Sequence, residues 1–298
     1  MIWQTSRFSI DLRRPQVMGI VNVTPDSFSD QGSFFSMPAA LAQCEKLLRD
    51  GADILDIGGE SSRPGAVPLP LDEELRRVLP VVREAVLLGC PVSVDTYKPQ
   101  VMQAVLDLGA DIINDIWALR WPDSVDGMMS QAIVSRHARC GVCLMHMHRE
   151  PQTMQVSPME GDVVSQVLLF LERSASDLRA LGVEKNRIVL DPGIGFGKTV
   201  AQNFSLLARQ RELLDTGYPL LAGWSRKSAL ATIVESEAKL SSSDGSHERM
   251  IPSVAAALLA VERGARIVRV HDVRETVQAL KVLNALESGG LIQTGGKT

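Results

Sequence analysis

The chain has 298 residues, of which 45% are hydrophobic and 22% charged, and its formal net charge is −4 at pH 7. This slightly acidic composition shows no basic stripe, which argues against a general nucleic-acid-binding protein. The N-terminal residues lack the apolar core of a signal peptide and no apolar run is long enough to span a bilayer, so we expect no membrane partner.

Eight short apolar runs that end on polar residues recur along the chain, at residues 17–22, 54–60, 92–96, 112–115, 142–146, 188–192, 220–225 and 267–271. Runs of this length between turn signals are typical of buried parallel strands. Segments of helical composition separate them, at residues 39–50, 72–88, 99–108, 124–140, 160–181, 200–215 and 252–263. The alternation predicts an α/β fold, a (β/α)8 TIM barrel, with residues 1–298 forming a single domain.

The N-terminal extension and two prolines carry further expectations. Residues 1–16 precede the first strand, and the alternating pattern of residues 8–12 predicts a small strand that plugs the barrel bottom. Pro80 should kink or divide its helix, because a proline ring removes a backbone donor and collides with the preceding turn. Pro252 should stand in the first turn of its helix, where that donor is not needed.

Three segments between the predicted strands and helices have the composition of loops. Residues 25–38 and 60–70 follow the first two strands on the catalytic face of the barrel, where long loops are typically lids. Residues 241–246 are polar and glycine-containing, which predicts a mobile loop.

Acidic and amide side chains end several of the predicted strands. Asp56, Asp95, Asn114 and Asp191 end the second, third, fourth and sixth strands, and these ends meet at one mouth of a barrel. One such residue alone is typically a structural residue or a helix cap. Burying four together costs free energy unless a ligand donates hydrogen bonds to them. A heterocycle with adjacent N–H donors, such as an aminopyrimidinone, fits because carboxylates bind such groups in bidentate fashion.

Positive side chains form a second group at the same mouth. Arg63 follows the second strand, Lys227 follows the seventh, and Arg269 and His271 lie two apart on one face of the eighth. The ends of strands seven and eight supply the usual phosphate site of this fold. Solvated surface charge is the alternative interpretation. Both groups together point to a heterocycle that carries phosphate.

Three further motifs are weaker. The glycine-rich segment 193–199 fails the nucleotide phosphate-loop pattern because Pro192 stands where its first glycine belongs, and its glycines are misplaced for dinucleotide binding. It remains either a tight turn or a close approach of backbone to ligand. Cys140 and Cys143 form a lone CxxC, and with Cys44 and Cys90 they give no disulfide framework, so we expect structural thiols in a reducing cytoplasm.

His146 and His148 share one face of an extended segment. Without an evident third ligand we do not expect them to hold a transition metal.

Seven segments together resemble the motifs of the dihydropteroate synthase family of folate biosynthesis. They are residues 22–30, 58–65, 95–96, 114–115, 191–198, 225–228 and 269–272, in the order of the family and over nearly the whole chain. The resemblance implies condensation of 6-hydroxymethyl-7,8-dihydropterin diphosphate with p-aminobenzoate to dihydropteroate and diphosphate. It also implies Mg²⁺ as cofactor, a homodimer, and inhibition by sulfonamides.

The resemblance also implies roles for particular residues. The residues similar to the pterin ligands are Asp95, Asn114, Asp191 and Lys227. The diphosphate and Mg²⁺ set is Asn22, Arg63, Arg269 and His271, with Asn22 as the metal ligand. The p-aminobenzoate pocket would contain Ser62, Pro64, Phe196 and Ser225. The expected catalytic residues are Arg63, Lys227, Arg269 and His271.

The chain departs from the family at a few positions. Ser62 replaces the usual threonine, His148-Arg149 replaces Gln-Gly, Trp224 is bulkier than usual, and Pro252 replaces a glycine. None of these changes removes a chemical group that the reaction needs.

Two alternatives to the synthase remain. A methyltransferase acting between methyltetrahydrofolate and a corrinoid protein would share the pterin ligands but would not need the cations of the diphosphate set. A non-catalytic pterin-binding paralogue would be expected to lose Asn22, Arg63 or a pterin ligand, and all are present.

Overall fold

The structure is a computed structural model that describes residues 1–24, 37–61, 63, 65–125, 127–235 and 245–287. The predicted site residues Ser62 and Pro64 lie outside the described residues. So do residues 25–36 of the first expected lid, together with most of the polar loop 241–246. The expectations for these segments therefore stay predictions.

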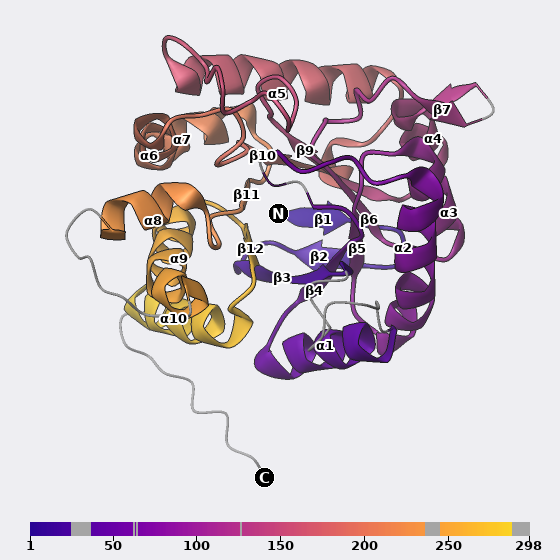
Figure 1. Ribbon diagram of the computed structural model, residues 1–298, viewed down its shortest axis with the longest axis horizontal. Helices are drawn as coiled ribbons and strands as arrows, with labels where there is room; N and C mark the ends of the chain where they lie inside the picture. The colour runs from indigo at the N-terminus through magenta and orange to yellow at the C-terminus, as the bar shows by residue number, and fades with distance from the viewer. Residues whose placement is uncertain (25–36, 62, 64, 126, 236–244, 288–298) are drawn as a thin grey trace.

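Eight parallel strands form the barrel, and the prediction of a (β/α)8 fold is confirmed (Figure 1). They are β3 (Gln16–Asn22), β4 (Ile54–Gly58), β5 (Val92–Asp95), β6 (Ile112–Asp115), β9 (Gly141–Met145), β10 (Ile188–Asp191), β11 (Leu221–Ala222) and β12 (Ile267–Val270). Their order is β10-β9-β6-β5-β4-β3-β12-β11. A parallel bridge between Leu190 and Leu220 joins the two ends of this sheet and closes it.

Helices surround the strands, as Figure 1 shows. They are α1 (Met37–Asp50), α2 (Leu71–Ala85), α3 (Pro99–Asp107), α4 (Ser130–Arg136), α5 (Val163–Ala180), α6 (Val200–Ala208), α7 (Gln210–Leu213), α8 (Ser228–Glu235), α9 (Gly245–Glu262) and α10 (Val273–Glu287). None of the helices among the described residues has the length and apolar character to cross a membrane. Apolar side chains from the outer faces of the strands pack against the inner faces of these helices as the main core.

Several predicted helices differ from those observed. The helix expected over 124–140 is only α4, because residues Ser124–Val125 and Met128–Met129 pair instead as the hairpin β7–β8. The helix expected over 200–215 is divided into α6, α7 and a 3-10 turn at Leu214–Thr216. The helices α8 and α10 were not anticipated.

Neither proline ends a helix. α2 continues through Pro80, and α9 begins before Pro252 rather than at it, so the expected place of Pro252 in a first turn was wrong. A proline inside a helix costs about 3 kcal/mol, and packing can outweigh that cost. The segment that follows Pro252 buries Ala256, Ala257 and Ala260, which holds the helix in place.

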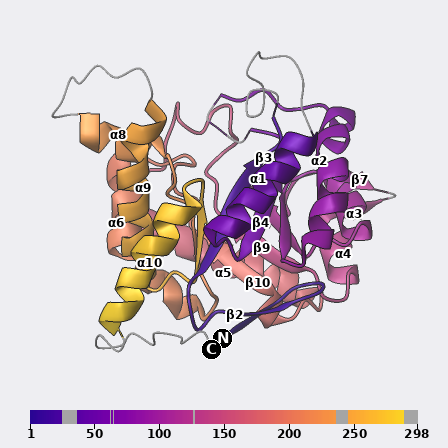
Figure 2. The same cartoon turned by 90° about the horizontal axis from the view of Figure 1, so that it is seen from below.

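The N-terminal residues close the lower end of the barrel, as expected. β1 (Ile2–Gln4) and β2 (Ser9–Asp11) form an antiparallel hairpin beneath the strands (Figure 2). Trp3, Ile10 and Leu12 of this segment pack against one side chain from each of seven barrel strands, Met18, Ile54, Ile112, Cys143, Val189, Leu221 and Ile267. This plug fills the lower end with apolar side chains and leaves the carboxyl ends of the strands as the open mouth.

Candidate active site

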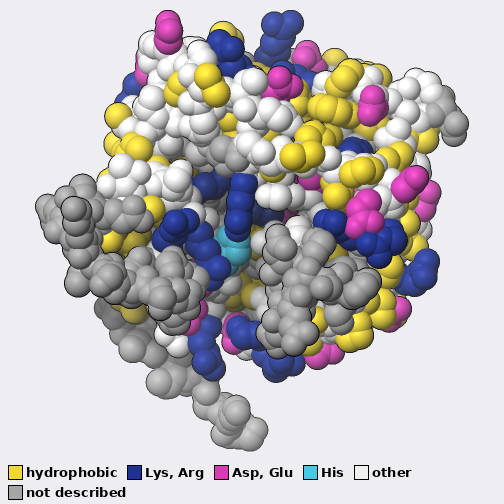
Figure 3. Space-filling model, viewed as in Figure 1, with side chains coloured by type: hydrophobic (Ala, Val, Ile, Leu, Met, Phe, Trp, Pro, Cys, Tyr) yellow, Lys and Arg dark blue, Asp and Glu magenta, His cyan; other side chains and the backbone are white. Residues whose placement is uncertain are grey.

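The carboxyl ends of the strands bring most of the predicted site residues together. Asn22, Asp95 and Asp191 are the last residues of β3, β5 and β10, and Asn114 is in register with Asp95 on β6. Ser225 and Lys227 follow β11, whereas Arg269 lies within β12 and His271 follows it. In Figure 3 the mouth is hollowed, and Lys, Arg and a histidine side chain line the hollow.

Arg269 bridges two strands across the barrel mouth. Its Nε donates to Asp56 Oδ2 at 2.5 Å and its Nη2 donates to Asp95 Oδ2 at 2.7 Å. Asn114 Nδ2 also donates to Asp56 Oδ2, at 3.3 Å. One guanidinium therefore joins a member of the basic group directly to two carboxylates of the acidic group.

Asp56 is deeper in the barrel than its sequence position suggested. It is the third residue of β4 rather than its end, is fully buried, and its Oδ1 has no hydrogen-bond partner in the part of the chain that the structure describes. A buried carboxylate oxygen without a donor is costly, so this atom marks where a donor-bearing group would be favoured.

Burial shifts the protonation of the groups that line the mouth. Burial raises the pKa of Asp95 to about 7, although the Arg269 guanidinium opposes this shift. Burial also raises the pKa of Asp191, against the backbone N–H of Gly193 that donates to its Oδ1 at 2.7 Å. Burial lowers the pKa of Lys227 to about 8, with Asp191 opposing. Perturbed groups gathered in one hollow are typical of an active site.

His271 is neutral at neutral pH. Burial, and then the nearby cations Arg226, Arg269 and Arg63, lower its pKa to about 3. Its Nδ1 lies 2.9 Å from Ser225 Oγ, which also accepts the backbone N–H of His271 at 3.1 Å. In this structure the lowered pKa disfavours a positive charge on His271, which leaves it a hydrogen bond to offer a ligand; its expected place in the diphosphate set stays a prediction.

Phe196 and Lys227 meet at the side of the mouth near Ser225. The Lys227 ammonium lies 4.3 Å from the centroid of the Phe196 ring, and Phe196 itself is buried. A cation held over a ring face at this distance is stabilised by the ring electrons. Arg63 is exposed on the loop after β4, and its charge contributes to the low pKa of His271.

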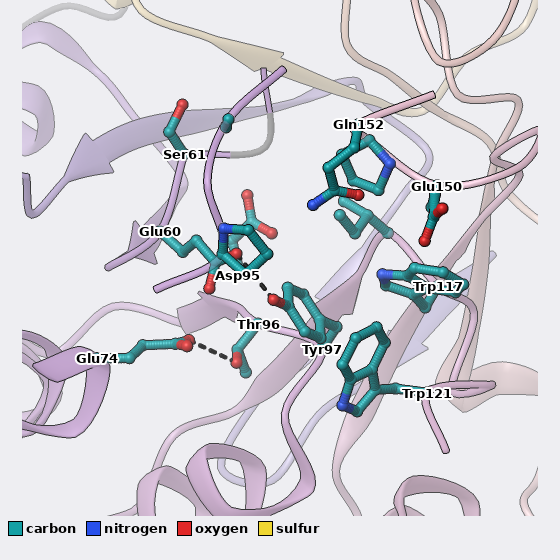
Figure 4. Close-up of a pocket in the computed structure, with 14 residues that line it drawn as sticks. Glu60, Ser61, Glu74, Asp95, Thr96, Tyr97, Trp117, Trp121, Glu150 and Gln152 are labelled. Carbon is teal, nitrogen blue, oxygen red and sulfur yellow. Dashed lines mark hydrogen bonds between the residues drawn. The ribbon is translucent and has the colours of Figure 1, made fainter. Parts of the chain in front are cut away.

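An aromatic pocket that sequence analysis missed continues the mouth beside Asp95 (Figure 4). Tyr97, Trp117 and Trp121 form its aromatic wall, with ring centroids 4.6 Å apart for the Tyr97–Trp121 pair and 5.1 Å for the Trp117–Trp121 pair. The only signal in the sequence was the close spacing of the two tryptophans after a predicted strand.

A buried ion network forms part of the wall of this pocket. The Lys98 ammonium bonds to Glu74 Oε2 at 2.5 Å and also to Glu60. Tyr97 Oη donates to Glu60 at 2.8 Å, and Thr96 Oγ1 donates to Glu74 at 2.7 Å. The network ties the start of the loop that carries Arg63 to helix α2 and to the end of β5.

The weaker motifs resolve as structural features. Each of the four cysteines is free and buried, as expected for structural thiols. Among the described residues no group of three or more His, Cys, Asp or Glu could hold a metal ion. Trp224 is 1% exposed and packs on Phe204, so its extra bulk fills the core rather than the site.

Comparison with known proteins agrees with this geometry. Residues 18–271 match the family described as pterin binding enzyme. A dihydropteroate synthase of Neisseria meningitidis serogroup B is 47% identical over 290 residues, which cover 96% of this chain and 97% of that protein.

Two solved structures are similar along nearly their whole length. Burkholderia cenocepacia dihydropteroate synthase complexed with 7,8-dihydropteroate has a TM-score of 0.83 at 48% identity, covering 97% of both chains. Yersinia pestis dihydropteroate synthase in a sulfonamide drug complex has a TM-score of 0.87 at 41% identity, covering 97% of this chain and 100% of that one.

The barrel and its mouth thus define a TIM-barrel enzyme of the pterin-binding class. Within that class, the identity and coverage show that the chain belongs to the dihydropteroate synthase family.

Proposed function

We propose that this chain condenses 6-hydroxymethyl-7,8-dihydropterin diphosphate with p-aminobenzoate, giving 7,8-dihydropteroate and diphosphate in folate biosynthesis. The observation that carries the proposal is the convergence at one barrel mouth of Asp95, Asn114 and Asp191 with Lys227 and Arg269. The product complex of the Burkholderia cenocepacia relative supports the same chemistry.

The acidic and amide groups would hold the pterin. The aminopyrimidinone edge presents adjacent N–H donors, and carboxylates bind such pairs in bidentate fashion. Asp95, Asp191 and Asn114 supply the acceptors, and Lys227 supplies a donor for the ring carbonyl. This recognition also relieves the cost of burying these carboxylates.

The cations would bind the diphosphate as it departs. The bond that breaks joins the pterin methylene carbon to the diphosphate oxygen, and the electron pair leaves with that oxygen. Arg63 and Arg269 stabilise the developing negative charge, and the neutral His271 adds a hydrogen bond. Because burial lowers the pKa of His271, we assign most of the positive charge that faces the diphosphate to Arg63 and Arg269.

The arylamine would attack the methylene carbon without a strong base. An arylamine is unprotonated at neutral pH, so its nitrogen lone pair is available, and the proton lost after bond formation passes to water. The carboxylates of Asp95 and Asp191 favour a cationic methylene by charge, which favours dissociative substitution. Phe196 and Ser225, with Ser62 and Pro64 outside the described residues, would form the arylamine pocket.

The residues at this mouth are compatible with a Mg²⁺ ion that binds together with the diphosphate. The described residues offer no multi-carboxylate cage, but Mg²⁺ commonly keeps its waters and binds through one or two protein oxygens and substrate phosphates. The amide oxygen of Asn22, at the end of β3, is a suitable ligand. When bound, the ion would neutralise charge on the leaving diphosphate.

We also propose a cytoplasmic homodimer. Exposed apolar side chains occur on the neighbouring helices α9 and α10, where Leu259 is 45%, Val282 70% and Leu286 77% exposed. Such a patch is suited to a subunit interface. The buried, unpaired cysteines fit a reducing compartment. Light scattering should give twice the chain mass, and Val282→Glu should shift it towards the monomer.

Diphosphate release in the presence and absence of p-aminobenzoate tests the proposed reaction. Release that depends on the arylamine, with formation of dihydropteroate, is the expected result. Slow release that p-aminobenzoate does not accelerate would favour the non-catalytic paralogue. Methyl transfer from methyltetrahydrofolate would favour the corrinoid-dependent alternative, which leaves the diphosphate cations unexplained.

A further inference from the structure

The turn between β10 and α6 encloses a buried ammonium group. Lys198 is 2% exposed, and its Nζ lies 2.8 Å from the carbonyl oxygen of Gly193, 3.1 Å from that of Phe196 and 2.9 Å from Nδ1 of His146. The carbonyl oxygen of His146 lies farther from this Nζ, at 3.4 Å, so the three donors of the ammonium are all engaged. The turn therefore binds its own lysine.

The imidazole in this contact is an acceptor. Burial and the Lys198 charge lower the pKa of His146 to about 2, so its ring is neutral. Burial also lowers the pKa of Lys198, to about 7, while the carboxylate of Asp191 opposes that shift. A hydrogen bond from the Lys198 ammonium to His146 Nδ1 therefore joins the end of β9 to the turn after β10.

The glycines of the turn explain its shape. Gly193, Gly195 and Gly197 have φ values of +69°, +84° and +69°, which favour glycine. A Cβ on Gly193 would lie 1.8 Å from the carbonyl oxygen of His146, and one on Gly197 would lie 2.6 Å from Cβ of His148. The turn is thus pressed against the chain that leaves β9.

Two of the glycine N–H groups of this turn are already engaged within the protein. The N–H of Gly193 bonds to Asp191 Oδ1 and the N–H of Gly195 bonds to Asn203 Oδ1, each at 2.7 Å. A phosphate loop turns its N–H groups towards the ligand, whereas this turn directs carbonyl oxygens at a lysine. The motif that resembled a phosphate loop is therefore an internal cation site.

The enclosed turn also supports the lysine that we place in the pterin site. A Cβ on Gly195 would lie 3.1 Å from Cδ of Lys227, so the Lys227 stem runs along the turn. The Lys227 ammonium lies over Phe196, which belongs to the same turn. Any movement of the turn would therefore displace Lys227 of the proposed pterin site and Phe196 of the proposed arylamine pocket together.

We propose that Lys198 is a positioning residue, whose ammonium fixes the 193–198 turn and thereby sets where Lys227 and Phe196 meet the two substrates. The proposal rests on the proposed condensation, and it assigns Lys198 no contact with either substrate. Misplacement of substrate-positioning groups by about 1 Å can lower a rate about 100-fold.

Lys198→Met keeps the length of the side chain and removes the three donors. In steady-state assays of the full-length protein we expect KM for p-aminobenzoate to rise and kcat/KM to fall by about 100-fold. Binding of inorganic diphosphate, measured by calorimetry, should be unchanged, since no hydrogen bond in the described part of the chain joins this turn to Arg63 or Arg269.

Arg187→Met is the matched control. Arg187 is also a buried cation between β9 and β10, and it donates to the carbonyl oxygens of Cys140 and Val134 at 2.8 Å, but at the opposite end of the strands. It should lower the melting temperature without changing KM. Lys198→Met with the kinetics of this control would overturn the proposal.

His146→Leu provides a second variant should Lys198→Met not fold. The variant removes the imidazole acceptor but keeps Lys198 and the carbonyl oxygens that it contacts. We therefore expect the same rise in KM for p-aminobenzoate, to a smaller extent. A wild-type KM in this variant would also count against the proposal. Inactive wild-type protein would instead refute the proposed condensation, so the two failures can be told apart.

Discussion

The two ends of the barrel use the same charged residue types in opposite ways. At the lower end, Asp111 accepts from the Arg7 guanidinium at 2.6 Å and from the backbone N–H groups of Arg7 and Val92, each at 2.9 Å. At the mouth, Asp56 keeps one buried oxygen without a donor among the described residues, and the pKa of Asp95 is raised to about 7. Charge that is fully satisfied stabilises the fold, whereas charge left partly unsatisfied favours a ligand.

The largest effect should come from removing pterin recognition at the mouth. Asp191→Asn and Lys227→Ala should each lower kcat/KM by at least about 100- to 1,000-fold, because each removes a charged partner inside a buried site. Asp191 is the last residue of β10 and Lys227 lies in the segment after β11, so neither belongs to the apolar core. Steady-state kinetics, with circular dichroism to establish folding, would measure this.

The lower end supplies the control for that experiment. Arg7→Met breaks the pair with Asp111, so it should lower the melting temperature while kcat and KM stay at wild-type values. Near-normal turnover in folded Asp191→Asn, or lost turnover in folded Arg7→Met, would remove the distinction between the two ends.

A smaller and more selective loss is expected for Arg63→Ala. The variant should weaken binding of the pterin diphosphate by about 10- to 100-fold, because a charge-assisted hydrogen bond contributes about 1.5–3 kcal/mol. A pterin without phosphates should bind normally, since Arg63 is exposed on the loop rather than at the acidic strand ends. Calorimetry with both ligands decides this, and equal losses would place Arg63 elsewhere.

The pH dependence of kcat/KM should show two limbs that arise at the mouth. Asp95 must be ionised to accept N–H donors, and its pKa is about 7, so kcat/KM should fall about tenfold per pH unit below that value. Lys227 loses its proton above its pKa of about 8, and Lys198 in the adjoining turn above its pKa of about 7, so both contribute to the alkaline limb. Asp95→Asn should lose activity and the acidic limb together; an unchanged limb in its residual activity would assign it to another group.

The barrel and most of its mouth could be predicted because strand ends are local patterns that the fold then gathers. The hydrogen-bond partners of those residues could not be predicted from the sequence. That Arg269 would bond to Asp56 depends on side chains 213 positions apart. The neutral state of His271 depends on burial, which no motif encodes. Pro252 was misplaced because packing of the later part of its helix outweighed a local rule.

The smallest effect should come from Ser62, which lies outside the described residues and stands where the family usually has threonine. A sulfonamide carries the same para-amino ring as p-aminobenzoate, so we expect the two to compete near Phe196 and Ser225. Ser62 keeps the hydroxyl group and lacks only a methyl contact, worth at most about 1 kcal/mol. Ser62→Thr should therefore shift KM for p-aminobenzoate and Ki for the sulfonamide in the same direction, each by less than roughly tenfold. Inhibition that excess p-aminobenzoate does not relieve would show that the two molecules occupy different sites.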